Sequence, residues 1–144
     1  MARPRFDEQV RNSLDRIRTR RVAVARESVQ RLVEVAQTPQ GAGGHMPVRD
    51  GFLRASLVAT TGPLPAARAR PEGQGRYAYD AGPVSLAIAS WDMTRPLRVV
   101  WTANYARYAH WGSRGRSGSP WVALAAQRFP QIVAEASRSA GEAR

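Results

Sequence analysis

The sequence contains no cysteine and no lysine, and it has only two histidines, His45 and His110, which lie far apart. Without cysteine, a disulfide framework and a thiolate metal site are both excluded. No apolar run approaches the roughly 20 residues that a membrane-spanning helix needs, so we expect no membrane contact. Residues 1–21 carry acidic side chains and no apolar stretch, which argues against a secretory signal peptide.

The patterns that catalytic and metal sites usually need are missing as well. Neither histidine belongs to a motif with ligand spacing, and Asp50, Asp80 and Asp92 fall at predicted turns, where aspartate is common for backbone reasons. The glycine-rich stretches lack the Gly-Lys-Ser/Thr end of a phosphate loop. We therefore expect no enzyme, no cofactor and no metal site.

What the sequence does have is arginine. All 22 basic residues of the 144 are arginine, and the net charge is +11. A chain of this length is most simply one domain, which we place at residues 1–144. The charge attracts polyanions, and the planar guanidinium fork suits contacts with carboxylates and aromatic rings at protein interfaces.

The N-terminal quarter predicts one long helix over residues 5–37. Apolar residues recur there near a 3.6-residue period, and neither glycine nor proline interrupts the stretch. Thr38-Pro39 ends it. A helix of about 30 residues is about 45 Å long, which is more than a compact domain of this size needs.

The middle of the chain predicts loops and strands. Residues 38–47 form a glycine-rich loop, 48–55 a short helix and 56–61 a strand, and residues 62–76, rich in Pro, Gly, Ala and Arg, form a flexible insert. Residues 77–82 predict a short edge strand. The alternating segments 83–91 and 97–105 predict an antiparallel hairpin joined by residues 92–96.

The C-terminal part predicts a flexible basic loop over residues 112–119 and a final helix that opens at Pro120. Pro130 should kink or restart this helix, and the last residues, 139–144, should fray. The predicted fold class is therefore α+β: a long N-terminal helix, a short helix, a three- to four-stranded antiparallel sheet, and a C-terminal helix packed on the sheet.

The stretch "NYARYAHWGS", residues 104–113, gathers aromatic side chains before the basic loop. One interpretation is purely structural: Trp101 and Tyr105 face the core, while Tyr108 and Trp111 cover the end of the sheet. The other is a groove for nucleic acid, because interleaved arginines and aromatics can bind phosphates and stack on bases. No recognition-helix or ribonucleoprotein-type motif supports sequence-specific reading.

Two segments and their separation resemble a known family. The first is Thr38-Pro39 followed by "DGFLRAS", residues 50–56; the second is "YARYAHWG", residues 105–112, followed by a Gly/Ser/Arg loop and Pro120-Trp121. Together they resemble the tail-completion, or neck, family of long-tailed bacteriophages, to which lambda-type tail-completion proteins belong. The sequence departs from that pattern at Asp50, where threonine is usual, and at His110, where glutamate is usual. Its loop 40–47 and insert 62–76 are also longer.

The resemblance implies a structural virion protein of the tail or neck, assembled in the host cytoplasm. It implies a ring of about six copies at the head–tail junction that helps to end the tail and join it to the head. The implied partners are further copies of the chain, the adjacent head-closure or connector protein, and the tail terminator or tube protein.

On this interpretation we predict two sets of contact residues. A neighbouring subunit or ring should contact Phe52, Arg54, Tyr105, Tyr108, His110 and Trp111. Packaged DNA in the channel, or a partner, should contact Arg68, Arg70, Arg76, Arg114 and Arg116. Two other functions remain open: a small basic nucleic-acid-binding module, and a tail terminator or tube protein of similar build.

Overall fold

The fold is α+β, as the sequence predicted, with helices in the majority. The computed structural model describes residues 5–73 and 75–142. In chain order the elements are α1 (Phe6–Gln37), the 3₁₀ turn η1 (Gln40–Ala42), α2 (Phe52–Ala55), β1 (Leu57–Thr60), α3 (Gly82–Ser90), β2 (Arg98–Trp101), α4 (Ala106–Trp111), β3 (Gly112–Ser113), β4 (Arg116–Ser117), α5 (Trp121–Gln127) and α6 (Phe129–Glu142).

Helix α1 has almost the bounds that its sequence predicted. At its start the Glu8 carboxylate accepts the backbone N–H of Arg5, which satisfies one of the amides that a helix leaves open at this end. At its end Thr38 turns to an extended backbone before Pro39, since the residue before proline avoids the helical conformation. With 32 residues the helix is about 48 Å long.

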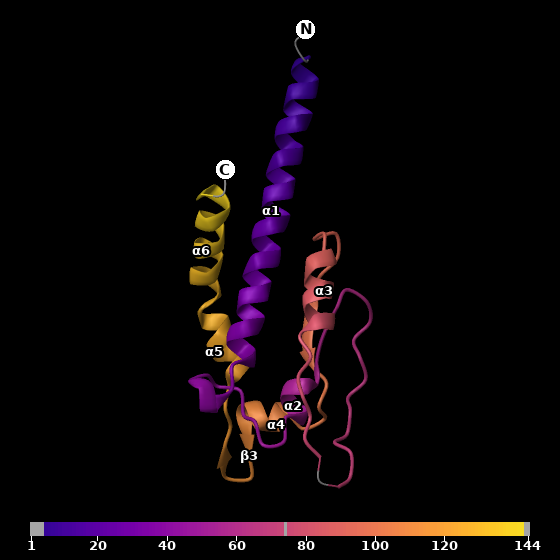
Figure 1. The fold of residues 1–144 in the computed structure, drawn as a ribbon, viewed down its shortest axis with the longest axis vertical. Helices are drawn as coiled ribbons and strands as arrows, with labels where there is room; N and C mark the ends of the chain where they lie inside the picture. The colour runs from indigo at the N-terminus through magenta and orange to yellow at the C-terminus, as the bar shows by residue number, and fades with distance from the viewer. Residues whose placement is uncertain (1–4, 74, 143–144) are drawn as a thin grey trace.

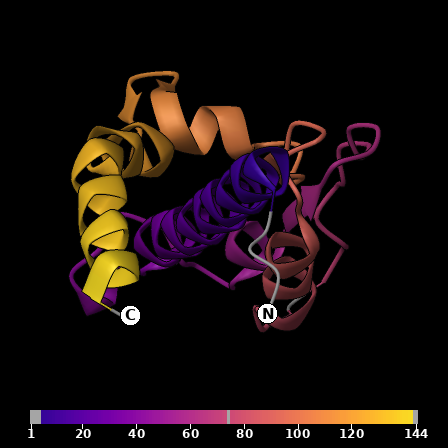
Figure 2. The same cartoon turned by 90° about the horizontal axis from the view of Figure 1, so that it is seen from above.

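Only the C-terminal half of α1 lies inside the molecule. Helices α5 and α6 pack along one side of it, and α3 packs along another, as Figures 1 and 2 show. The N-terminal half rises beyond the ends of both α3 and α6 (Figure 1). Every residue from 5 to 21 is exposed there, so the described part of the chain gives this half of the helix little tertiary cover.

The predicted three- to four-stranded sheet was wrong. The described residues form two sheets of two strands each, β1 with β2 and β3 with β4. In the larger sheet Leu57 lies opposite Trp101 and Thr60 opposite Arg98, antiparallel. Residues 77–81 form no strand, and the predicted hairpin partner of β2 is absent because residues 82–90 are the helix α3.

The reason for the α3 error lies in the spacing of its apolar residues. Alternation would bring Val84, Leu86 and Ile88 to one face, but a helix brings together residues three or four apart and turns residues two apart away from each other. The structure buries Val84 and Ile88 and leaves Leu86 70% exposed, which is the helical outcome. Pro83 lies in the first turn of the helix. Proline is tolerated there because backbone nitrogens of the first turn donate no hydrogen bond within the helix.

The core consists of two clusters on either side of Trp101. One gathers around Met46, Phe52 and Trp121, and the other around Leu57 and Ile88. Trp101 touches both clusters, and its ring lies edge-on to Trp121 with the centroids 5.7 Å apart. The interpretation that Trp101 faces the core is therefore confirmed.

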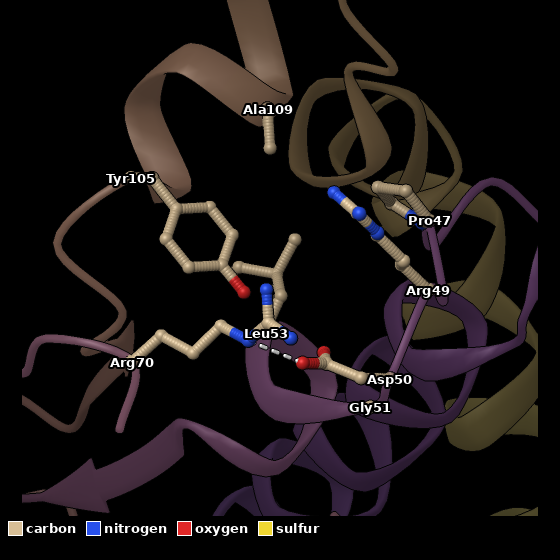
Figure 3. A pocket seen from close by; sticks show the side chains of 8 residues that line it. All are labelled: Pro47, Arg49, Asp50, Gly51, Leu53, Arg70, Tyr105 and Ala109. Carbon is tan, nitrogen blue, oxygen red and sulfur yellow. Dashed lines mark ion pairs between the residues drawn. The ribbon is translucent and has the colours of Figure 1, made fainter. Parts of the chain in front are cut away.

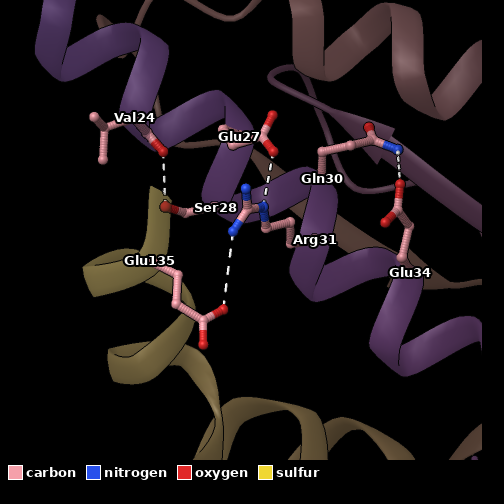
Figure 4. A network of polar contacts seen from close by, with 7 residues as sticks. All are labelled: Val24, Glu27, Ser28, Gln30, Arg31, Glu34 and Glu135. Atoms are coloured by element: carbon pink, nitrogen blue, oxygen red, sulfur yellow. Dashed lines mark hydrogen bonds and ion pairs between the residues drawn. The ribbon is translucent and has the colours of Figure 1, made fainter. Parts of the chain in front are cut away.

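The C-terminal helix is divided, as Pro130 led us to expect, but the break comes at Arg128 and Pro130 lies in the first turn of α6. The predicted packing of this helix on the sheet was wrong for α6, which packs against α1. Figure 4 shows one link: Arg31 of α1 lies between Glu27, 2.8 Å away, and Glu135 of α6, 3.9 Å away. Helix α6 continues to Glu142, and the predicted fraying of 143–144 lies outside the described residues.

The predicted insert has no regular element between residues 62 and 73, as expected. It is nevertheless attached to the body at Arg68. The Arg68 backbone N–H donates to the carbonyl of Thr102, and the Arg68 carbonyl accepts the N–H of Asn104. These bonds hold Arg68 beside residues 102–104. Arg70, two residues further on, pairs with Asp50 of the first motif segment.

Candidate functional site

The two motif segments, far apart in the sequence, meet in the structure. The first supplies α2 and the loop before it, and the second supplies Tyr105 and α4. Phe52 joins them: its ring centroid lies 6.2 Å from that of Tyr105 and 5.2 Å from that of Tyr77. The segments that carry the family resemblance therefore form one region of the molecule.

A close backbone approach in this region requires glycine. Gly51 has φ +89°, a left-handed conformation that other residues rarely adopt, and it precedes α2. A Cβ at this position would clash with the Tyr77 carbonyl oxygen. The Tyr77 N–H in turn donates to the Asp50 carbonyl over 2.8 Å, so the glycine lets residues 50–51 and 77 pair.

A cavity of about 300 Å³ opens between the motif segments (Figure 3). Asp50 lies at its floor: Oδ1 accepts the Phe52 backbone N–H over 3.1 Å, and Oδ2 lies 2.5 Å from Nε of Arg70. The second contact is an ion pair whose N–H is not aligned for a hydrogen bond. The lining residues are Pro47, Arg49, Asp50, Gly51, Leu53, Arg70, Tyr105 and Ala109.

Charges in the cavity act on Tyr105. Burial raises the pKa of its hydroxyl, and the Asp50 carboxylate raises it further, while Arg70 and Arg49 oppose the change. The hydroxyl is therefore protonated at neutral pH and can donate a hydrogen bond. Arg49 points into the cavity from the side opposite Arg70 (Figure 3), and it has no ion-pair partner in the part of the chain that the structure describes.

The predicted subunit-contact residues divide by exposure. Helix α4 places Tyr108 and Trp111, three residues apart, on its outer face, where they are 59% and 70% exposed. Tyr105 is half-buried, and Arg54 is held by its Nε bond to the Gln37 carbonyl and by its position over the Tyr79 ring. Phe52 is 4% exposed. A contact role for these residues stays a prediction.

His110 does not lie at the surface where we expected it. The segment 106–111 is a helix and not the end of a strand, and it turns His110 inward while Tyr108 and Trp111 stay exposed. It is 8% exposed, its Nε2 accepts the Ala123 backbone N–H over 3.3 Å, and its ring lies against Trp111 and Trp121. Burial lowers its pKa. The usual glutamate of the family pattern would have to enter the same buried space.

The arginines predicted to face DNA lie in two separate places. Arg114 and Arg116 are exposed on the β3–β4 hairpin, which replaces the loop that the sequence predicted. Arg68, Arg70 and Arg76 belong to the segment between β1 and α3, with Arg68 over the Phe52 ring at 5.9 Å and Arg70 paired with Asp50. Both segments reach the end of the molecule opposite the N-terminus (Figure 1).

A second feature is the free half of α1. Its apolar residues Phe6, Val10, Leu14 and Ile17 follow one another at helical spacing and are 81%, 41%, 45% and 54% exposed; we call them the α1 stripe. The stripe leads into a groove of about 560 Å³, which we call the α1–α6 groove. Its apolar walls come from Ile17, Val24, Val29, Trp91, Met93, Phe129 and Val133.

Sequence reasoning missed the cavity and its charges. Asp50 was interpreted as a turn residue and as a departure from the family motif, and Arg70 as a predicted contact with DNA or a partner on a flexible insert. The ion pair between them was not predicted, because they lie far apart in the sequence. Arg49 was not singled out, although its place beside the first motif segment was a usable signal.

Among residues 5–73 and 75–142, no group of three or more His, Cys, Asp or Glu side chains is placed to hold a metal ion. None of the helices in this part of the chain combines the length and apolar character required to cross a membrane. In comparisons with known proteins, no family model, no curated protein and no solved structure matches the chain.

Proposed function

We propose that this protein is a structural subunit of a bacteriophage virion that forms a ring at the head–tail junction, where it helps to end the tail and join it to the head. The resemblance of residues 50–56 and 105–112 to the tail-completion family suggests this role. The observation that carries it is the free half of α1, which exposes an apolar stripe that a single chain does not cover.

The energetics favour covering this stripe. Fully burying a large apolar side chain contributes about 1.5–3 kcal/mol, and the exposed fractions of the four stripe residues amount to about two such side chains. Cover would therefore contribute roughly 3–6 kcal/mol per subunit before the entropic cost of association. A helix without tertiary packing gains little stability from propensity alone, so the free half of α1 is better explained by a partner.

A second copy of the chain supplies a matching surface. In a ring each subunit uses one face toward the subunit before it and a different face toward the next. The α1 stripe and the α1–α6 groove provide two surfaces of this kind, which meet at Ile17; both are mainly apolar, and the groove lining also includes Arg20 and Arg21. In this arrangement the α1 stripe of one subunit lies in the groove of its neighbour. Tyr108 and Trp111 then contact the adjoining ring, since aromatic side chains are enriched in such contacts.

The decisive experiment is electron microscopy of a lysate from which only this reading frame has been deleted. The proposal expects DNA-filled heads beside detached or abnormally ended tails. Intact, infectious particles would reject it.

Variants supplied to the same deletion lysate test the surfaces. Leu14→Arg should fail to restore joined particles, because it puts a charge into the proposed contact, whereas Thr19→Arg on the opposite side of α1 should restore them. Both purified variants should keep the thermal midpoint of the parent, since neither position lies in the core. Equal rescue by the two variants would contradict the proposed role of the stripe. Tyr108→Ala with Trp111→Ala should fail in the same assay if α4 faces the adjoining ring.

The exposed Arg114 and Arg116 of the hairpin favour a second candidate, a nucleic-acid-binding module. This candidate expects the purified protein to bind duplex or single-stranded DNA at submicromolar strength with a steep dependence on salt. The first proposal expects weak DNA binding by the free protein. Fluorescence anisotropy over a salt series separates the two.

A further inference from the structure

The cavity between the motif segments has more positive charge than negative. Asp50 is the one carboxylate among its lining residues, and Arg70 already lies against it. The second guanidinium group, that of Arg49, points into the same space and has no ion pair within the described residues. One positive charge in the cavity therefore has no ion-pair partner in the described part of the chain.

The walls and size of the cavity restrict what can compensate it. Its volume of about 300 Å³ is at the lower end of the range for ligand pockets, so it fits one side chain and not a bulky molecule. Pro47, Leu53 and Ala109 provide apolar walls beside the charges. A glutamate side chain combines a short apolar stem with a planar carboxylate, and a guanidinium fork binds such a carboxylate through two parallel hydrogen bonds.

A nucleic-acid phosphate fits less well. Each phosphate is joined to a sugar on both sides, so the sugars would have to fit between the apolar walls together with the phosphate. Basic surfaces that follow a phosphate backbone are open grooves, as in single-strand binding proteins.

We infer that this cavity binds the carboxylate of a glutamate side chain from a partner protein, with Arg49 as the principal ligand. Arg70 and the Tyr105 hydroxyl complete the site from the opposite wall. In the proposed function, the glutamate comes from an adjoining protein of the virion. The inference rests on the proposed function for this source. Binding of the carboxylate itself requires no ring, so the two can be tested apart.

The test is a titration of the isotopically labelled protein, followed by nuclear magnetic resonance, with three small probes. N-acetyl-glutamate methylamide carries the proposed side chain, N-acetyl-glutamine methylamide is its neutral match, and dimethyl phosphate represents the nucleic-acid backbone. We expect saturable shifts of the Arg49, Arg70 and Ala109 amides with the glutamate probe and at least about tenfold weaker binding of the glutamine probe.

Arg49→Gln should weaken binding of the glutamate probe by about tenfold or more, since a hydrogen bond to a charged group contributes about 1.5–3 kcal/mol. Arg18→Gln, which removes the same charge from the free half of α1, is the matched control and should leave the affinity unchanged. Arg49 is exposed and unpaired, so its variant should keep the thermal midpoint.

Three results would overturn the inference: no saturable shift with the glutamate probe up to about 20 mM, equal affinity of the two amino-acid probes, or no effect of Arg49→Gln. Tighter binding of dimethyl phosphate than of the glutamate probe would assign the cavity to nucleic acid. If the probes fail while the deletion lysate still shows separated heads and tails, the site is wrong and the proposed function stands.

Discussion

Gln37, the last residue of α1, should be the most sensitive polar residue of the fold. It is 3% exposed, and its side chain joins two other elements. Its Nε2 donates to the Arg54 carbonyl at the end of α2, and its Oε1 accepts the indole N–H of Trp101 in β2, both over 2.9 Å. The Gln37 side chain therefore links the end of α1 to both α2 and β2.

Gln37→Met keeps the length of the side chain and removes both hydrogen bonds. It leaves a partly buried indole donor and a partly buried carbonyl without partners, at about 1–3 kcal/mol each, while the apolar methionine recovers part of that loss. We expect the free energy of unfolding to fall by about 2–4 kcal/mol, a large share of the 5–15 kcal/mol typical of a domain.

The assay is urea unfolding followed by tryptophan fluorescence. With a slope of about 2 kcal/mol per molar urea, the midpoint should fall by about 1–2 M. Gln30→Met is the control, because the Gln30 side chain makes only an exposed bond to Glu34 four residues on, over 3.3 Å, which contributes about 0.2–0.5 kcal/mol (Figure 4). If the two variants unfold within about 0.5 kcal/mol of each other, the hydrogen bonds of Gln37 do not hold α1 to the sheet.

Two further predictions concern the motif segments. Gly51→Ala should destabilise the protein by about 1–2 kcal/mol more than Gly43→Ala, as measured by thermal unfolding, because both glycines have positive φ but only Gly51 faces a backbone atom, the Tyr77 carbonyl; equal losses would show that the contact relaxes freely. Burial lowers the pKa of His110 below its usual 6.5, so the unfolded chain takes up a proton at a higher pH than the folded one. The free energy of unfolding should therefore fall as the pH is lowered from about 7.5 to about 5.5, and His110→Phe should reduce that slope in urea titrations at each pH; an unchanged slope would assign the pH dependence to other groups.

Local sequence was sufficient where one physical rule dominated. The absence of glycine and proline from Arg5 to Gln37, followed by Thr38-Pro39, predicted α1 almost to the residue. The strand predicted over 56–61 was confirmed as β1, and the restart of the last helix near Pro130 was confirmed as α6.

Sequence-based prediction failed where the apolar residues of a short segment fitted both the two-residue period of a strand and the 3.6-residue period of a helix. Val84 and Ile88 fit both an alternating strand and one face of a helix, and nine residues are too few to decide. The segment around His110 was also misassigned. Its aromatics were expected to cover the end of a sheet, whereas residues 106–111 form the helix α4, which ends at Gly112 with φ +88°.

The candidate site shows the same division. The sequence alone identified the two motif segments and the exposed pair Tyr108 and Trp111, and it determined the class of the fold and the positive charge of the chain. Only the tertiary structure brought Arg70 to Asp50 and pointed Arg49 into the cavity between the motif segments. It also buried His110 and left the N-terminal half of α1 exposed. Periodicity and turn chemistry act over a few neighbouring residues, so a sequence can express them directly. A cavity and an ion pair between distant segments depend on how the chain returns to itself, and no local pattern encodes that return.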